Sequence, residues 1–112
     1  MDKVTHLSDL DMLEAAIEES QDRPVLLFKH SRSCGVSCEA LDELHSHLEA
    51  GVANAHYHVI TVQSHRRVSD VTSQRIGIRH ETPQVIVLKD GQPVWNASHF
   101  RITAAELSRV LS

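Results

Sequence analysis

The two cysteines of the chain, Cys34 and Cys38, are the residues best suited to covalent chemistry. A cysteine thiolate is the nucleophile of thiol–disulfide exchange, and neighbouring cationic groups favour the thiolate. Lys29, His30 and Arg32 lie within five residues of Cys34 and can supply positive charge. A free cysteine is most often a small buried hydrophobe, but the polar turn before Cys34 favours a reactive thiol.

The position of Cys34 along the chain supports the same expectation. It stands between an apolar run predicted as a buried strand, residues 25–30, and a helix predicted to end near Ala50. The first turn of a helix has N–H groups without carbonyl partners and carries the positive end of the helix dipole. A thiolate at this turn is stabilised, which suits single-thiol exchange.

Two further residues complete the candidate catalytic set. Ser37 falls on the buried stripe of the predicted helix, three positions after Cys34, where a Cys-x-x-Cys motif keeps its resolving thiol. Cys38 falls on the flank of that stripe, with its Cα about 6 Å from that of Cys34 in a regular helix, within disulfide range. The sequence leaves open whether Cys38 resolves or protects Cys34, or only packs.

Hydrophobic periodicity predicts the elements that position these residues. Asp90-Gly91 is a strong two-residue hairpin signal, and Gly51 is expected at a helix C-cap. Helices are expected over residues 8–20, from the turn after residue 30 to about 50, over 69–76 and from Thr103 onward, and strands over 25–30, 56–62, 84–89 and 92–97.

The order of these elements, α-β-α-β-α-β-β-α, predicts one α/β domain over residues 1–112. A strand–helix–strand unit implies a parallel crossover, and the hairpin implies an antiparallel pair. The result is a thioredoxin-like fold, a four-stranded mixed sheet with helices on both faces. In that fold the proline that opens a strand, here Pro83, is cis and faces the nucleophile, and the Thr82 backbone pairs with an extended substrate. A trans proline that only begins the strand is the alternative.

Composition restricts the function classes. Eleven basic and 15 acidic residues give a net charge of −4 over 112 residues, which is too acidic for a nucleic-acid-binding surface. The apolar runs are far shorter than the roughly 18 residues of a membrane span, and Met1–His6 contains no apolar leader. We therefore expect a cytoplasmic protein that binds neither nucleic acid nor membrane.

The chain has nine histidines, and the pairs His45/His47 and His56/His58 raise the question of a metal site. Residues two apart on a helix point about 200° apart, so His45 and His47 cannot easily share an ion, whereas His56 and His58 share a strand face. Spacing places no cysteine or carboxylate near them, so we predict solvated or half-buried histidines and no metal. His30, before the turn that carries Cys34, and His99, before the last helix, are candidates to tune the thiol or to contact its ligand, and a structural role is the alternative for each.

Several sequence blocks carry a family resemblance that spans essentially the whole chain. They are Pro24–Ser31, Cys34–Ser37, His80–Val85, Lys89–Gly91 and Trp95–Thr103. On these blocks the chain resembles the YtxJ family, the monothiol bacilliredoxins of the bacillithiol system within the thioredoxin-like superfamily. Two features differ from the family pattern: Gly35 replaces the proline of the usual Thr-Cys-Pro-Ile-Ser block, and Cys38 is not a usual family residue.

The resemblance implies removal of bacillithiol from S-bacillithiolated proteins. Cys34 would attack the mixed disulfide, release the protein thiol and retain bacillithiol. A second low-molecular-weight thiol, a partner redoxin or a reductase would then reset the protein. No bound cofactor is implied, because bacillithiol is the redox co-substrate. The residues expected to contact the substrate are Arg32, Gly35, Thr82, Pro83 and His99.

Three other functions stay open. The first is a dithiol oxidoreductase that cycles a Cys34–Cys38 disulfide. The second is an iron–sulfur carrier, because the Cys34–Ser37 block is similar to the Cys-Gly-Phe-Ser motif of monothiol glutaredoxins, although Ala97–His99 stands where those proteins carry a glycine pair. The third is a binding module that uses the groove at Thr82-Pro83 without chemistry.

Overall fold

The computed structural model describes residues 4–51 and 53–111. Met1–Lys3 and Ser112 lie outside the described residues. The predicted absence of an apolar leader in Met1–His6 and the two ends of the predicted domain over residues 1–112 fall partly on them. The strands are β1 (Val4–His6), β2 (Val25–His30), β3 (His56–Thr61), β4 (Gln84–Lys89) and β5 (Gln92–Ser98). The helices are α1 (Leu10–Glu19), α2 (Gly35–Ala50), α3 (Arg66–Ile76) and α4 (Ala104–Leu111), with a 3₁₀ turn η1 (His99–Arg101).

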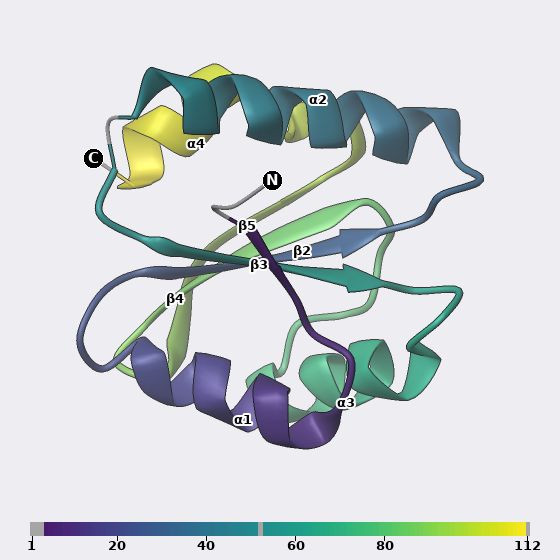
Figure 1. Cartoon of the computed structure of the whole chain (residues 1–112), viewed down its shortest axis with the longest axis vertical. Helices are drawn as coiled ribbons and strands as arrows, with labels where there is room; N and C mark the ends of the chain where they lie inside the picture. The colour runs from purple at the N-terminus through teal and green to yellow at the C-terminus, as the bar shows by residue number, and fades with distance from the viewer. Residues whose placement is uncertain (1–3, 52, 112) are drawn as a thin grey trace.

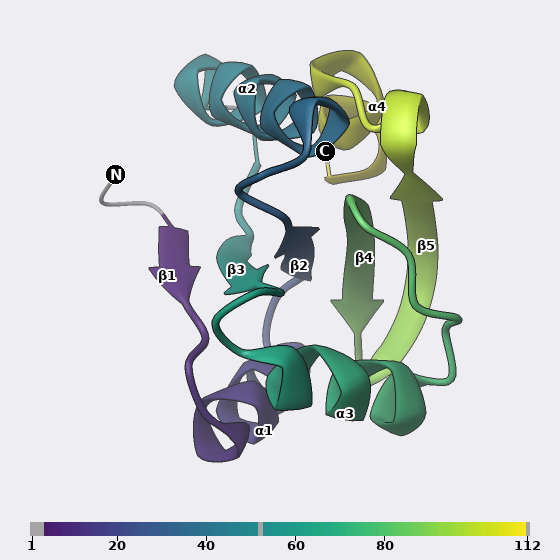
Figure 2. The ribbon, with the colours of Figure 1, turned by 90° about the vertical axis from the view of Figure 1, so that its right-hand side faces the viewer.

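The strands form one sheet in the order β1-β3-β2-β4-β5. Strand β3 pairs in parallel with β1 and β2, whereas β4 pairs antiparallel with β2 and β5. Helices α2 and α4 cover one face of the sheet, and α1 and α3 cover the other (Figures 1 and 2). This confirms the predicted thioredoxin-like α/β arrangement of a mixed sheet between two helical layers.

The prediction of four strands was wrong, because β1 adds a fifth at the edge. Its residues Val4, Thr5 and His6 pair with Tyr57, His58 and Val59 of β3. Thr5 and His6 are exposed and Val4 is half-buried. A three-residue strand held mainly by backbone hydrogen bonds has no apolar alternation, which is the pattern that sequence analysis detects.

Strand β2 is buried at all six positions because helices cover both of its faces. Leu26 and Phe28 pack in the core beneath α2 and α4. Val25 and Leu27 pack in the second core, against α1 and α3. This alternation is the period of a strand, and it decides on which side of the sheet each later residue of β2 points.

Several element bounds differ from the predicted ones. Helix α1 begins at Leu10, because the Asp9 carboxylate caps it by accepting the Met12 N–H at 2.8 Å. Helix α3 begins at Arg66, three residues before the predicted start, in a polar and mostly exposed stretch that apolar periodicity does not register. Strand β3 ends at Thr61 and β5 continues to Ser98.

The predicted turns are confirmed. Asp90 and Gly91 both have positive φ, 53° and 75°, as a tight hairpin between β4 and β5 requires. Gly51 ends α2 in the left-handed conformation with φ 64°. None of the helices in residues 4–51 and 53–111 has the length and apolar character needed to cross a membrane.

Candidate active site

Cys34 is the N-cap residue of α2, at the turn that follows β2. Its backbone is extended, with φ −107° and ψ 120°, and its carbonyl accepts the Cys38 N–H at 3.0 Å, which begins the helix. The side chain makes no capping hydrogen bond, and the thiol is free and half-buried. The sulfur therefore lies where the first-turn N–H groups of a helix favour an anion, with solvent access on one side.

Ser37 is completely buried, and its hydroxyl holds the turn that carries Cys34. The Ser37 Oγ accepts the Ser31 N–H at 2.9 Å and lies 2.8 Å from His30 Nδ1. These contacts tie the first turn of α2 back to the end of β2. The residue predicted at the place of a resolving thiol is thus a positioning residue, with no surface from which to meet a substrate.

His30 accepts the hydrogen bond of the Ser37 hydroxyl in this arrangement. Because the Ser31 N–H donates to Ser37 Oγ, the hydroxyl proton is free to be donated to His30 Nδ1. Burial lowers the pKa of His30, and the charges of Arg32 and His6 lower it further. A neutral imidazole, which can accept at Nδ1, is the form that these surroundings favour.

The outer side of the turn is held by Gln63, a residue that sequence reasoning missed. Its side-chain amide donates to Ser31 Oγ at 2.8 Å and to Ser33 Oγ at 3.0 Å, and its oxygen accepts the Arg32 N–H at 3.2 Å. Arg32 itself is exposed and donates to Ser64 Oγ at 3.1 Å. Parallel pairing of β2 with β3 brings the residues that follow both strands to one edge of the sheet. This pairing is the signal that could have predicted a contact between Gln63 and the Cys34 turn.

Cys38 lies one turn after Cys34 and is exposed. Its sulfur is 3.8 Å from the Arg32 carbonyl oxygen, a weak S–H···O contact. Gly35, also exposed, has open space where a Cβ would stand: beyond its two chain neighbours and the backbone of the same helix turn, no described atom lies within 4 Å of that position. A substrate or a second thiol therefore has room to approach this side of the turn.

The predicted cis peptide between Thr82 and Pro83 is confirmed. Gln84, the next residue, pairs with Lys29, so Pro83 lies beside the end of β2 at the edge where Cys34 follows. The Pro83 carbonyl accepts the His99 N–H at 3.1 Å. This hydrogen bond holds His99, which was predicted to contact the substrate, at the same edge. The fold thus brings Pro83 and His99, which were predicted separately, to the edge of the sheet where Cys34 lies.

His99 is exposed and adopts a left-handed backbone with φ 56° as it opens the turn η1. This conformation is uncommon for a residue with a Cβ. His99 and the strongly exposed Phe100 line a hollow of about 290 Å³ together with Val36 and Glu39 of α2. The hollow adjoins the first turn of α2, which follows the candidate nucleophile Cys34.

Lys29 was predicted to supply positive charge near Cys34, and the structure does not place it there. Its side chain points to the face of the sheet that α1 and α3 cover. Its ammonium is completely buried and donates to Ser73 Oγ of α3 at 2.6 Å, with His80 Nδ1 at 3.1 Å. Burial lowers the pKa of Lys29 to about 8, although Asp70 opposes the change. The alternation of β2, in which Lys29 follows Leu27, explains this direction.

The imidazole of His80 links this buried amine to the cis-proline segment. Its Nδ1 faces Lys29, and its Nε2 lies 3.2 Å from Thr82 Oγ1. Burial lowers the pKa of His80, and the charges of Lys29 and Arg66 lower it further. A neutral ring therefore accepts from Lys29 and donates to Thr82, so that His80 positions the residue expected to pair with the substrate.

Comparison with known proteins agrees with this geometry. A solved structure described as a candidate oxidoreductase with a thioredoxin fold has 29% sequence identity and a TM-score of 0.87, with 99% of this chain and 96% of that one covered. Thioredoxin from Fasciola hepatica has 17% identity and a TM-score of 0.75, over 96% and 95%. Chloroplastic thioredoxin z has 22% identity and a TM-score of 0.76, over 97% and 91%. The latter two show the fold alone.

The sequence profile described as "Monothiol bacilliredoxin BrxC" matches residues 5–107, which is nearly the whole chain. The match includes the Cys34 turn, the cis-proline segment and the His99 turn. Together with the thioredoxin fold, it supports a thiol redox function. The chain belongs to the monothiol bacilliredoxin family.

Proposed function

We propose that this protein removes bacillithiol from S-bacillithiolated proteins by thiol–disulfide exchange at Cys34. The observation that carries the proposal is a free, half-buried thiol at the N-cap of α2, at the edge of the sheet that also holds the cis peptide before Pro83. Family membership supports bacillithiol as the thiol that is transferred.

The exchange proceeds in two balanced steps. The Cys34 thiolate attacks the bacillithiol sulfur of the mixed disulfide, the substrate disulfide breaks, and its electron pair leaves with the protein thiolate. Cys34 then carries bacillithiol in a new disulfide. The thiolate of a second low-molecular-weight thiol, or of a partner redoxin or reductase, then attacks the bacillithiol sulfur. It forms a new disulfide with bacillithiol, and the electron pair of the broken bond leaves with the Cys34 thiolate. Bacillithiol is the redox co-substrate, and the cycle needs no bound cofactor.

The surrounding residues have separate roles in this proposal. The backbone of Thr82, before the cis proline, pairs with the extended chain around the substrate cysteine. His99 and the hollow beside it receive the thiol ligand. Arg32 and Gly35 form the exposed rim of the turn, where the absence of a side chain at Gly35 leaves room for the attacked disulfide.

A dithiol cycle is the second candidate, and the exposure of Cys38 favours it. In this cycle the Cys38 thiolate attacks Cys34 of the mixed disulfide, a Cys34–Cys38 disulfide forms, and bacillithiol leaves with the electron pair. The first turn of a regular helix places such residues within disulfide range, although their side chains are poorly aligned. The dithiol cycle therefore requires the Cys34 and Cys38 side chains to realign, whereas the single-thiol cycle does not.

The test is the rate at which a bacillithiolated model protein regains its free thiol, with bacillithiol as reductant. Wild type, Cys34→Ser and Cys38→Ser are compared, and the same model protein carrying glutathione is the control for thiol choice. The proposal predicts loss of the reaction in Cys34→Ser, retention in Cys38→Ser and a faster reaction with bacillithiol than with glutathione. Loss in Cys38→Ser would favour the dithiol cycle, and equal rates for both thiols would contradict the substrate assignment.

A further inference from the structure

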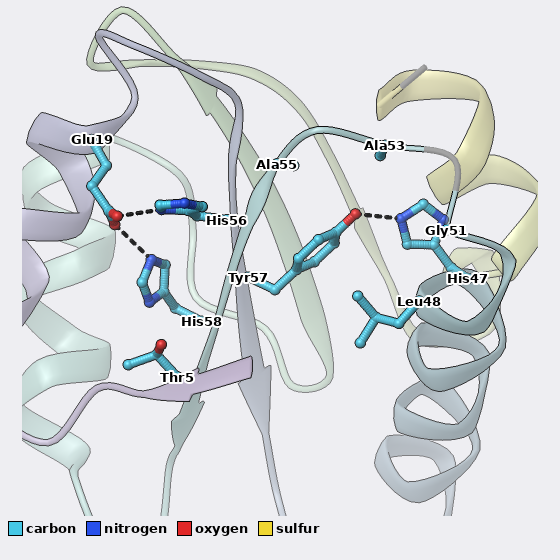
Figure 3. A pocket seen from close by; sticks show the side chains of 10 residues that line it. All are labelled: Thr5, Glu19, His47, Leu48, Gly51, Ala53, Ala55, His56, Tyr57 and His58. Carbon is cyan, nitrogen blue, oxygen red and sulfur yellow. Dashed lines mark hydrogen bonds and ion pairs between the residues drawn. The ribbon is translucent and has the colours of Figure 1, made fainter. Parts of the chain in front are cut away.

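Glu19, His56 and His58 form a cluster, which Figure 3 shows from close by. The two carboxylate oxygens of Glu19 contact different rings: Oε1 lies 2.9 Å from His58 Nε2, and Oε2 contacts His56 Nδ1. One ligand atom from each residue lies within 4.8 Å of the others. His56 pairs with Val25 at the start of β2, whereas Cys34 follows the end of that strand.

The fold brings these residues together from two distant segments. His56 and His58 are two apart on β3, so their side chains leave the same face of the sheet. Ile60, the next residue in this series, packs in the core against α1 and α3. Glu19 is the last residue of α1, which covers this face, and its carboxylate therefore meets both rings. Sequence spacing places no carboxylate near the two histidines, which is why the cluster escaped prediction.

We propose that Glu19, His56 and His58 bind a divalent transition-metal ion of the zinc class. Two imidazole nitrogens and one carboxylate oxygen are a common three-ligand set for zinc, in which a fourth position takes water or another ligand. With metal–ligand bonds of about 2.1 Å, neighbouring ligands of a tetrahedral ion are about 3.4 Å apart. The present Glu19–His58 distance of 2.9 Å means that this pair of ligand atoms must separate by only about 0.5 Å.

An opening beside the cluster provides the remaining coordination position. A hollow of about 460 Å³ is lined by Glu19, His56, His58 and Thr5 on one side of β3, and it extends past Tyr57, whose side chain points away from the cluster toward His47 in Figure 3. The Glu19 and His56 side chains are partly exposed, so an ion can reach them from solvent. His58 is the buried ligand, with 8% of its side chain exposed.

The protons on the two rings can move to make room for an ion. His58 Nδ1 is buried and has no hydrogen-bond partner among the described residues. Among the described contacts, the Glu19 carboxylate therefore keeps the His58 proton on Nε2. When this proton moves to Nδ1 of the same ring, Nε2 is free to bind a metal. His56 Nε2 accepts from Arg23 at 3.2 Å, so its proton is at Nδ1 in the metal-free form. Arg23 is exposed, and it can turn to solvent when that proton moves to Nε2.

Zinc titration of the Cys34→Ser/Cys38→Ser double variant tests the proposal, because this protein has no thiol to bind the ion. Isothermal calorimetry should give one zinc ion per chain at micromolar or tighter affinity, and thermal unfolding should shift upward with zinc. Replacing zinc with cobalt should give the visible absorption of a four-coordinate site. Absence of saturable zinc binding in this background would overturn the proposal.

Variants locate the ion. In the same background, Glu19→Gln, His58→Asn and His56→Asn should each weaken zinc binding by at least about tenfold. His45→Asn, a half-buried histidine of α2 outside the cluster, is the matched control and should leave the affinity unchanged. His56 is the most exposed ligand, so His56→Asn keeps the test valid where a variant at the buried His58 fails to fold. Unchanged affinity in Glu19→Gln and His56→Asn would overturn the proposal.

Discussion

The buried Lys29 makes folding stability depend on pH in a way that one substitution can isolate. In the folded chain its pKa is lowered by burial from the ordinary 10.5 to about 8. In the interval between these values the unfolded chain binds more protons than the folded chain, so a rise in pH favours the folded state. Lys29→Met removes this titration and keeps a side chain of similar length at the same buried position.

The size of the effect follows from the two pKa values. Below about pH 8 the folded protein holds a buried ammonium, and the full cost is about 3 kcal/mol. Linkage predicts that the wild type recovers about 1 kcal/mol of unfolding free energy by pH 9 and about 2 to 3 kcal/mol by pH 10, relative to Lys29→Met. Groups that titrate equally in both proteins, such as Tyr57, cancel from the difference.

Urea unfolding of reduced wild type and Lys29→Met between pH 7 and pH 10 measures this difference. Lys89→Met, which replaces an exposed lysine at the end of β4, is the matched control and should run parallel to the wild type. We expect the stability of the wild type to rise toward or past that of Lys29→Met as pH increases. Parallel curves for wild type and Lys29→Met would refute the assignment of a buried, pKa-shifted amine.

Three further substitutions or titrations check other parts of the structure. Ser37→Ala should lower the unfolding free energy by about 1–3 kcal/mol, because it leaves the half-buried Ser31 N–H of the Cys34 turn without its side-chain acceptor; the exposed Ser46→Ala is its control, and equal urea midpoints for Ser37→Ala and the wild type would contradict the contact. Glu43→Ala should cost about 1 kcal/mol in the same assay, because its carboxylate accepts the first backbone N–H of α4 at 2.8 Å, and an unchanged midpoint would refute this cap. Burial raises the pKa of Tyr57, the single tyrosine, to about 12; ultraviolet titration of the phenol should show this midpoint, and ionisation near 10 in the folded protein would contradict it.

The elements that hold the site were predictable because they follow from local patterns. The apolar run of β2, the leucine stripe of α2 and the Asp90-Gly91 turn each carry a signal within a few residues. The thioredoxin-like order of these elements then placed Pro83 beside the end of β2. By contrast, β1 is short and polar, and backbone pairing with β3 holds it, so side-chain patterns did not reveal it.

The missed residues are those that only the tertiary fold brings into contact. Gln63 meets the Cys34 turn because β2 and β3 end at the same edge. Glu19 reaches His58 across 39 residues, from the last turn of α1 to the middle of β3. Lys29 was placed near the thiol by its sequence number, but strand alternation directs it to the other face.

The most direct test of the account is to locate bacillithiol on the protein itself. The reduced wild type, Cys34→Ser and Cys38→Ser are mixed with a bacillithiolated model protein, quenched by acid, digested and mapped by peptide mass. We predict a bacillithiol adduct on Cys34 in the wild type and in Cys38→Ser, and no adduct in Cys34→Ser. An adduct that forms on Cys38 when Cys34 is present, or that persists at the same level in Cys34→Ser, would contradict Cys34 as the nucleophile.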